Sequence, residues 1–442
     1  MSERGPGARL PDLLVELQRR ARRGMELDLS RMRQVLAAFG DPHRALAAVH
    51  VAGTNGKGSV CAMVEEVARR AGLRAGLYTS PHLARFAERI RIGGAPVEDA
   101  AFAAALEAAL RRAPVELTFF EAMTTAALLA FRDAGVELCI LEVGLGGRLD
   151  ATNVVEAPLV TAITSIALDH TDVLGPTLAH VAREKAGILK PGSPVVLGPL
   201  NPEADRVIAE VAAAVGAGPI WRVGVGEGGE GEAREIQVAR RGRGVDVVGP
   251  GGRRASAELG LRGPHQADNA AVACGVVWQL AARRPALALD AALPAALAAA
   301  RWPGRLERLD AGDATVLLDC AHNPHGAAAL AAALEEDGQR PEATTLVFGA
   351  LADKGWQEML KILAPTAARR VYTAPQGRAP APLPALAAIA PGEAVPEPAA
   401  ALARALAITP PGGLVVVAGS IYLVGEIRAA LLNIPSDPTI AL

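Results

Sequence analysis

An apolar strand that leads through a glycine-rich turn into a helix constrains the fold of this chain more than any other segment. Residues 48–60 read AVHVAGTNGKGSV, with three glycines at the turn and the start of the helix. Glycines let backbone N–H groups turn toward an anion, and a helix N-terminus adds partial positive charge. Lys57 follows the turn, so we expect its amine to reach the terminal phosphates of a nucleotide. The segment predicts a phosphate-binding loop on a parallel sheet.

The spacing of this loop differs from the common GxxxxGK[ST] pattern, because Gly58 stands between Lys57 and Ser59. The alternatives are a P-loop kinase, a GTPase-like switch, or a glycine-rich turn that binds nothing. The order of strand, lysine and helix favours ATP binding by the whole loop. The expected ATP-binding residues are Gly53, Thr54, Asn55, Gly56, Lys57, Gly58 and Ser59.

Short β-rich runs alternate with amphipathic stretches, which is typical of an α/β fold with a mostly parallel sheet. In the first half we expect strands at Ala47–Val51, Ala75–Tyr78, Leu138–Val143, Leu159–Thr164 and Pro194–Leu197. The expected helices are Gly58–Ala71, Asp99–Arg112, Glu121–Asp133, Thr177–Ile188 and His265–Ala282. A second series begins near residue 301, with strands at Thr315–Leu318, Thr344–Phe348, Arg370–Thr373 and Leu414–Ala418.

The length of 442 residues suits two domains. We expect an ATP-binding P-loop α/β domain over residues 1–298 and a smaller Rossmann-like domain over residues 299–442. A Gly- and Arg-rich stretch at about 224–256 predicts an exposed hairpin or ragged insertion rather than core. The Pro- and Ala-rich residues 374–398 predict a loop with one short helix.

Composition excludes several classes of partner. The net charge is −2 and there are only four Trp, three Tyr and seven Phe, so we expect no nucleic acid partner. Four separated cysteines without a CxxC pair favour neither a zinc ribbon nor a disulfide framework, and they indicate a reducing cytoplasm. The first residues lack the pattern of a signal peptide. Charged residues and prolines interrupt the Ala-rich stretches, so we expect no membrane partner.

Lysine is scarce in this chain. The 45 basic residues include five lysines, at positions 57, 185, 190, 354 and 361. Arginine cannot lose its proton or form a carbamate, so a lysine in such an arginine-rich chain points to a chemical requirement.

The motifs together resemble one family. GTNGKGS is similar to the P-loop of the Mur ligase superfamily, and particularly of its folylpolyglutamate synthase and dihydrofolate synthase branch. Further matches follow in order: YTSPHL (78–83), TFFE (118–121), LEVGLGGRLDATN (141–153), ITSIALDHTDVLGPT (163–177), EKAGILKPG (184–192), HQADNAA (265–271), WPGRLE (302–307), DCAHNP (319–324), GALADK (349–354) and GSIYLVGE (419–426). The matches span residues from about 45 to 426.

The resemblance implies a P-loop NTPase-like Mur ligase central domain followed by a smaller Rossmann-like domain that binds glutamate. It also implies an ATP-dependent ligase that adds L-glutamate to dihydropteroate, to folates or to both through an acyl phosphate, releasing ADP and phosphate. The chain would then be a cytoplasmic monomer whose partners are ATP, L-glutamate and dihydropteroate or folates. Folylpolyglutamate synthase activity alone, or another Mur-type amino-acid ligase, is the alternative.

The family pattern implies two Mg²⁺ sites and leaves room for a monovalent cation. Ser80 and Glu142 match the residues that hold one Mg²⁺, and His170 matches the ligand of a second. The alternatives are a turn cap, an exposed strand-end charge and a packed loop histidine. Lys185 matches the family lysine that CO₂ converts to a carbamate; its alternative is a salt bridge on a helix surface with Glu184 or Asp169.

In the second half, Asn269, Arg305 and Asp319 match nucleotide-contacting positions, although Arg305 could instead form an interdomain ion pair. Asp319, His322 and Ser420 resemble the glutamate pocket, and His322 is a candidate acceptor for the proton of the amine. Cys320 stands where the family usually has glycine, and its side chain would crowd the turn or face solvent.

Two segments resemble the surface that holds the pterin-bearing substrate. The expected residues are Thr118, Phe119, Phe120, Glu121, Leu149, Asp150 and Ala151. The two phenylalanines offer a platform for a flat ring, although a core role for at least one of them is the alternative.

Two other classes of function stay open. Cell-wall Mur ligases carry a further N-terminal domain, and the 52 residues before Gly53 are too few for a typical one. A non-catalytic nucleotide-binding scaffold would be expected to lack residues such as Lys57, Glu142 or Asp319, which are all present.

Overall fold

The computed structural model describes residues 9–21, 28–224 and 235–437. Contacts divide the chain into two compact units. Unit 1 comprises residues 1–80, 87–260 and 267–300, and unit 2 comprises residues 81–86, 261–266 and 301–442. The main division therefore falls between residues 300 and 301, two residues beyond the expected domain boundary. The sequence did not indicate that two short segments from the first half belong to unit 2.

Unit 1 is built on an eleven-stranded sheet in its described part, in the order β11-β10-β9-β8-β7-β6-β1-β5-β2-β3-β4. The strands from the first half are β1 (Ala48–Ala52), β2 (Ala75–Tyr78), β3 (Ile90–Ile92), β4 (Ala95–Pro96), β5 (Leu138–Glu142), β6 (Val160–Ile163), β7 (Val195–Leu197) and β8 (Ile220–Gly224). Strands β2, β5, β1, β6, β7 and β8 are parallel neighbours. The five strands expected from the sequence are confirmed.

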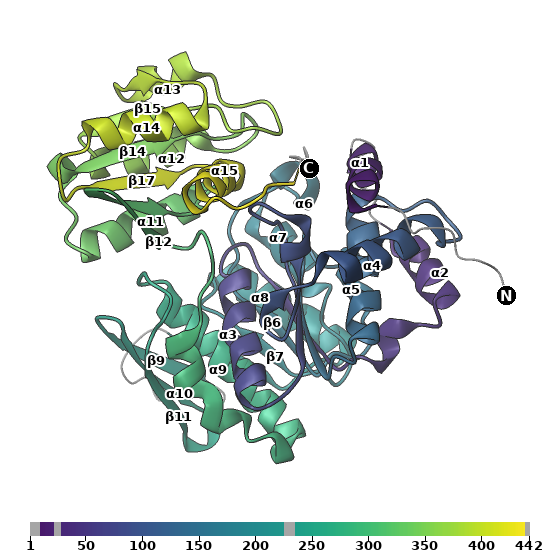
Figure 1. Cartoon of the computed structure of the whole chain (residues 1–442). Helices are drawn as coiled ribbons and strands as arrows, with labels where there is room; N and C mark the ends of the chain where they lie inside the picture. Colours follow the sequence, from purple (N-terminus) through teal and green to yellow (C-terminus); the bar gives the residue numbers. More distant parts are fainter. Residues whose placement is uncertain (1–8, 22–27, 225–234, 438–442) are drawn as a thin grey trace. The chain divides into compact units, whose positions relative to one another are not determined.

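Helices cover this sheet (Figure 1), and the residues of its central strands are therefore buried throughout. They are α1 (Leu10–Ala21), α2 (Ser30–Ala38), α3 (Lys57–Arg70), α4 (Asp99–Arg111), α5 (Phe119–Asp133), α6 (Thr171–Leu174), α7 (Leu178–Ala186), α8 (Pro202–Val215), α9 (Gln266–Arg283) and α10 (Leu289–Ala299). The five helices expected from the sequence are confirmed to within two residues at each end.

Within residues 224–256 the expected hairpin is confirmed, because residues 235–241 and 244–249 pair as antiparallel strands. The expectation that this stretch lies outside the core is wrong for its described part. Residues 225–234 lie outside the described residues. Strands β9 (Glu235–Arg241), β10 (Gly244–Gly249) and β11 (Arg253–Glu258) extend the sheet beyond β8. Ile236, Val245 and Val247 are buried on its inner face. Arg241 on β9 and Arg254 on β11 are exposed. The many arginines and glycines of this stretch hid the alternation of a half-buried strand.

Among its described residues, unit 2 contains a six-stranded sheet in the order β12-β13-β17-β14-β15-β16. Its strands are β12 (Glu307–Ala311), β13 (Ala314–Leu318), β14 (Thr344–Phe348), β15 (Arg369–Tyr372), β16 (Glu393–Ala394) and β17 (Leu414–Ala418). Its helices are α11 (Pro324–Glu336), α12 (Trp356–Leu363), α13 (Leu383–Ile389), α14 (Pro398–Ile408) and α15 (Ile421–Leu432). All pairs are parallel except β12 with β13. The expected strands and the short helix within residues 374–398 are confirmed.

Within the described ranges, none of the helices has the length and apolar character needed to cross a lipid bilayer.

Replacement of Trp278 tests the contribution of β9–β11 to the core. Its side chain is 1% exposed on α9, and a Cβ added to Gly249 at the end of β10 would lie 2.3 Å from its ring. We expect Trp278→Ala to lower the free energy of unfolding of unit 1 by about 3–5 kcal/mol, through lost burial and a cavity. Chemical denaturation followed by circular dichroism measures the change. Val215→Ala, at a position 36% exposed, should change it by less than about 0.5 kcal/mol. Equal effects of the two substitutions would contradict the role given to Trp278.

Candidate active site

The loops that carry the expected phosphate and metal residues follow neighbouring parallel strands. Strand β1 pairs with β5 and β6, and β5 also pairs with β2. Residues 53–56, 79–80, 143–150 and 164–170 follow the carboxyl ends of these four strands. The carboxyl edge of an open α/β sheet is where such folds bind ligands, so the topology brings these loops together.

Two glycines give the phosphate loop its path. Gly53 and Gly56 have φ values of 146° and 86°, which side-chain-bearing residues rarely adopt. A Cβ on Gly53 would lie 1.9 Å from Oγ1 of Thr164, and one on Gly56 would lie 2.3 Å from Oδ1 of Asn269. The loop therefore packs without room for a side chain at either position, and the side chain of Asn269 lies against Gly56.

The segment after β6 holds the loop in place. The backbone N–H of Thr54 donates to the carbonyl of Ser165 at 2.8 Å, and the N–H of Asn55 donates to Oγ of Ser165 at 3.0 Å. Oγ1 of Thr164 donates to the carbonyl of Asn55 at 2.6 Å. Thr164 and Ser165 were not among the site residues expected from the sequence. The feature that could have identified them is the pair of hydroxyl side chains directly after β6, the strand that pairs with β1.

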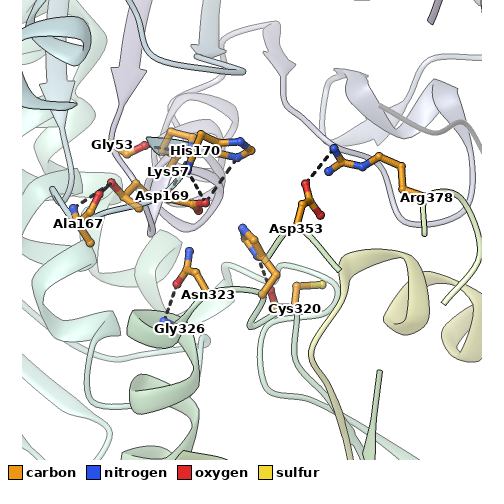
Figure 2. A network of polar contacts seen from close by, with 12 residues as sticks. Gly53, Lys57, Ala167, Asp169, His170, Cys320, Asn323, Gly326, Asp353 and Arg378 are labelled. Atoms are coloured by element: carbon orange, nitrogen blue, oxygen red, sulfur yellow. Dashed lines mark hydrogen bonds and ion pairs between the residues drawn. The ribbon is translucent and has the colours of Figure 1, made fainter. Parts of the chain in front are cut away.

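Two lysine amines donate to the same carbonyl oxygen. Nζ of Lys57 lies 3.1 Å from the oxygen of Gly53 (Figure 2) and 3.2 Å from that of Thr54. Nζ of Lys185, on α7, lies 2.9 Å from the Gly53 oxygen. Burial, and then the nearby charge of Lys57, lower the pKa of Lys185 to about 7, although Asp169 opposes the shift. The amine of Lys185 is therefore partly neutral at neutral pH.

The alternative role for Lys185, a salt bridge on a helix surface, is wrong. Its side chain belongs to the buried residues, with 5% exposure. The neighbouring Glu184 pairs with Arg148 at 2.9 Å. Lys185 thus lies inside the site, beside the phosphate loop.

Ser80 and Glu142 come together at the ends of β2 and β5. Glu142 is 5% exposed, and its Oε2 accepts a hydrogen bond from the backbone N–H of Ser80 at 3.2 Å. A buried carboxylate and a serine at adjacent strand ends offer oxygen donors of the kind that suits Mg²⁺. The residues therefore fit the ion that the sequence implied.

His170 lies on the loop tied to the phosphate loop. Its φ is 51°, its side chain is exposed, and Nε2 lies 3.7 Å from Oδ1 of Asp169 (Figure 2). In the described part of the chain no three His, Cys, Asp or Glu side chains gather into a metal cluster. The expected ligands are one serine and one glutamate for the first ion and one histidine for the second. This arrangement does not bring three such side chains to one point.

Several of the residues expected to hold the pterin-bearing substrate form internal bonds instead. Oδ2 of Asp150 accepts the N–H groups of Gly144 and Leu145 at 3.0 and 2.9 Å, so this buried carboxylate fixes the loop after β5. Burial raises the pKa of Asp150. Thr118 and Glu121 cap α5 reciprocally. These three side chains shape the surface through the backbone they hold.

The two phenylalanines have different environments. Phe119 is 3% exposed, and the guanidinium of Arg89 lies 5.1 Å from its ring centre. Phe120 is half-buried, with its ring centre 6.0 Å from that of Tyr78. The core role left open for one phenylalanine is confirmed for Phe119. Phe120 and the half-buried Leu149 are the partly exposed apolar members of the expected surface.

In unit 2, Asp319 follows β13 and is 6% exposed. Its carboxylate accepts the N–H of Leu306 at 3.0 Å and of Ala321 at 2.9 Å. Burial raises its pKa, and the charge of Arg305 opposes that effect. Asp319 and Arg305 are therefore close enough to interact within this unit.

His322 and Ser420 also lie at carboxyl ends of strands in unit 2. Nδ1 of His322 donates to the carbonyl of Cys320 at 2.9 Å. In a neutral ring, this bond places the proton on Nδ1 and the lone pair on Nε2. Ser420 is 2% exposed, and its Oγ accepts the N–H of Tyr422 at 3.2 Å as the cap of α15.

Both expectations for Cys320 are wrong. Its side chain is 3% exposed and belongs to an apolar cluster with residues of β13 and α15. A Cβ on Gly304 would lie 2.7 Å from its sulfur, so glycine at 304 leaves the space that the thiol needs. Burial raises the pKa of this thiol to about 12, and it stays protonated.

Two family models match the chain. The Mur ligase middle domain matches residues 51–277, and the glutamate ligase domain of Mur ligases matches residues 304–421. Folylpolyglutamate synthase of Lacticaseibacillus casei is 35% identical over 92% of this chain and 95% of its own length. Dihydrofolate synthase/folylpolyglutamate synthase of Bacillus subtilis is 36% identical over 77% of this chain and 79% of its own.

A longer relative also matches. The probable bifunctional folylpolyglutamate synthase/dihydropteroate synthase of Haloferax volcanii is 37% identical over 90% of this chain, which spans 47% of that protein.

Solved structures resemble the chain over nearly its whole length. E. coli FolC in complex with DHPP and ADP has a TM-score of 0.84 and 32% identity, covering 97% of this chain and 99% of that one. The Yersinia pestis bifunctional folylpolyglutamate synthase/dihydrofolate synthase complexed with AMPPNP and Mn has a TM-score of 0.83 and 33% identity, covering 97% and 100%.

Substitution of Gly53 tests the geometry of the loop. Gly53→Ala would place a Cβ against Thr164, so we expect affinity for ADP to fall by at least about tenfold, or about 1.4 kcal/mol. Gly72→Ala is the matched control, because Gly72 also has a positive φ of 85° but no atom within 4 Å of an added Cβ. Calorimetric titration of both variants with ADP measures the difference. Equal affinities would mean that the contact with Thr164 does not shape the site.

Proposed function

The chain belongs to the Mur ligase family, in its folylpolyglutamate synthase and dihydrofolate synthase branch, and we propose that it joins L-glutamate to dihydropteroate, to folates or to both at the expense of ATP. The observation that carries the proposal is the arrangement around Gly53, where two lysine amines meet a loop with the features of a phosphate site. Solved relatives that hold ADP, DHPP and AMPPNP with Mn support it.

The reaction needs an activated acid. A carboxylate is anionic and would have to expel oxide, so it does not react with an amine under mild conditions. Transfer of the γ-phosphoryl group from ATP gives an acyl phosphate, whose phosphate is a good leaving group. Attack by the amine of glutamate then forms the amide and releases phosphate.

The loop of residues 53–59 would bind the phosphates of ATP. Its N–H groups and the N-terminus of α3 supply fixed positive potential, and Lys57 would leave its backbone acceptors to reach the terminal phosphates. Ser80 and Glu142 would hold one Mg²⁺ and His170 a second. Bound Mg²⁺ neutralises charge on the transferred phosphoryl group. Asn269, Arg305 and Asp319 would contact the nucleotide.

Lys185 would carry a carbamate. Its neutral amine attacks the carbon of CO₂ and then loses one proton to water, which leaves an anionic carbamate. An ordinary lysine, with a pKa of about 10.4, is almost fully charged near pH 7. The lowered pKa of Lys185 makes its neutral amine available at that pH. The product is an anion beside Lys57 that can orient a cation of the site.

Asp319, His322 and Ser420 would form the glutamate pocket of unit 2. The amine of glutamate must lose a proton before or during attack. Nε2 of His322 is suited to accept it, because the bond to the Cys320 carbonyl keeps the proton of the ring on Nδ1.

The pterin-bearing acid would lie against Phe120 and Leu149. We further propose that the enzyme acts as a cytoplasmic monomer.

Release of ADP tests the function. With dihydropteroate or a folate as the acid, we expect ADP release that depends on L-glutamate, and a product heavier by one or more glutamyl residues by mass spectrometry. A UDP-muramoyl acid tested beside them separates the cell-wall ligases. Lys57→Ala should lower kcat by about 100-fold or more, because the phosphate-facing cation is lost. Lys361→Ala, an exposed control on α12, should leave it unchanged. Glutamate-independent ATP hydrolysis, or full activity of Lys57→Ala, would contradict the proposal.

Substitution of Lys185 tests the carbamate. Lys185→Arg keeps a positive charge but cannot form the adduct, so we expect kcat to fall by about 100-fold. Formate or acetate should restore part of the activity of Lys185→Ala by supplying the missing anion. Activation of CO₂-depleted enzyme by bicarbonate should grow as pH rises through about 7, because the neutral amine then predominates. Unchanged turnover in Lys185→Arg, with no rescue of Lys185→Ala, would remove the carbamate from the mechanism.

A further inference from the structure

Helix α2 precedes the residues matched by either family model, and it contacts both segments proposed to hold the acid substrate. It packs beside α5 (Figure 1) and on the 3₁₀ turn of Ala151–Val154. Oγ1 of Thr125, on α5, lies 3.7 Å from the sulfur of Met32. Met32 also shares an apolar cluster with Ala151 and the partly buried Phe120. The helix thus joins the first turn of α5 to the end of the loop after β5.

The polar part of this contact is the pair of Arg31 with Glu121. The side chain of Glu121 is 4% exposed and that of Arg31 is 21% exposed. Oε1 of Glu121 accepts from Nε and Nη2 of Arg31, both at 3.2 Å. Oε2 accepts the backbone N–H of Thr118 at 2.8 Å. One carboxylate therefore links α2 to the start of α5.

The position of Phe120 depends on how the first turn of α5 is held. Phe119 precedes it in the core under Arg89, and Glu121 follows it in the bond network. The ring of Phe120 covers Gly144, where an added Cβ would lie 2.4 Å from its Cζ. A buried carboxylate that loses a cationic partner must find water or another donor, which would open the first turn of α5. Such a change would displace the ring of Phe120 from its place over Gly144.

We infer that Arg31 is a positioning residue for the acid substrate: through Glu121 it sets the Phe120 surface on which the aromatic acid is recognised. The inference rests on the proposed function and extends it to a segment outside the family models. It makes α2 part of the specificity site, although Arg31 does not touch the reacting atoms. The binding of ATP, which uses residues 53–59, does not depend on this pair.

Kinetics of Arg31 variants separate this role from a general structural one. We expect Arg31→Ala to raise KM for dihydropteroate by about tenfold or more, as the loss of one partner of a buried pair predicts. KM for ATP should stay within about twofold of the wild-type value, since the phosphate loop is untouched. Arg31→Lys should recover part of the loss, because it restores the charge but not the two donors on one oxygen. Arg33→Ala, exposed on the same helix, is the matched control and should change neither constant.

A double substitution checks the route through Glu121. If Arg31 acts through that carboxylate, Glu121→Gln should weaken acid binding, and Arg31→Ala should add little in the Glu121→Gln background. Equal rises in KM for ATP and for the acid, or unchanged acid binding in Arg31→Ala, would overturn the inference while leaving the proposed function intact. Wild-type protein without glutamate-dependent turnover would overturn the proposed function and this inference with it.

Discussion

The carbonyl oxygen of Gly53 is the point on which the rest of the site depends. It accepts from Lys57 at 3.1 Å and from Lys185 at 2.9 Å, so two amines share one acceptor at the edge of a buried strand. Burial makes the charged form of Lys185 costly, and the nearby charge of Lys57 adds to that cost. Both effects lower the pKa of Lys185. The two amines therefore lie against one peptide unit, and burial leaves the amine of Lys185 partly neutral near pH 7.

Beyond the phosphate loop, hydrogen bonds from backbone N–H groups to buried carboxylates hold several segments of the site in place. Asp150, Glu121 and Asp319 each use their carboxylates to hold N–H groups of a loop or helix start. Burying a carboxylate costs free energy unless donors compensate, and here the donors belong to the segments that need to be fixed. These carboxylates hold their segments in place through bonds that do not involve a ligand.

Much of the fold could be predicted from the sequence. The strands around β1 are short apolar runs between helical stretches, so their positions followed from periodicity alone. Strands β9–β11 were missed, because glycines and outward-facing arginines dilute the alternation that marks a half-buried strand. The assignment of residues 81–86 and 261–266 to unit 2 was also missed, since membership of a unit depends on contacts that local sequence does not record.

The residues of the candidate site could also be predicted only where their role depends on local sequence. The loop glycines and Lys57 were evident, because their chemistry is local. Thr164 and Ser165 were not, because their role exists only once β6 lies beside β1. Cys320 was expected at a crowded turn or in solvent, yet it packs against Gly304, sixteen positions earlier in the chain. What a residue contacts across the fold was the information that the sequence alone lacked.

The burial of all four cysteines has a practical consequence. Cys61, Cys139, Cys274 and Cys320 are free and buried, and burial raises the pKa of each thiol. Native thiols shielded in this manner react slowly with maleimides, so a cysteine introduced on each unit could carry a spin label or a fluorophore without removal of the natural ones. The separation of the two units could then be followed through the catalytic cycle in an otherwise unaltered protein.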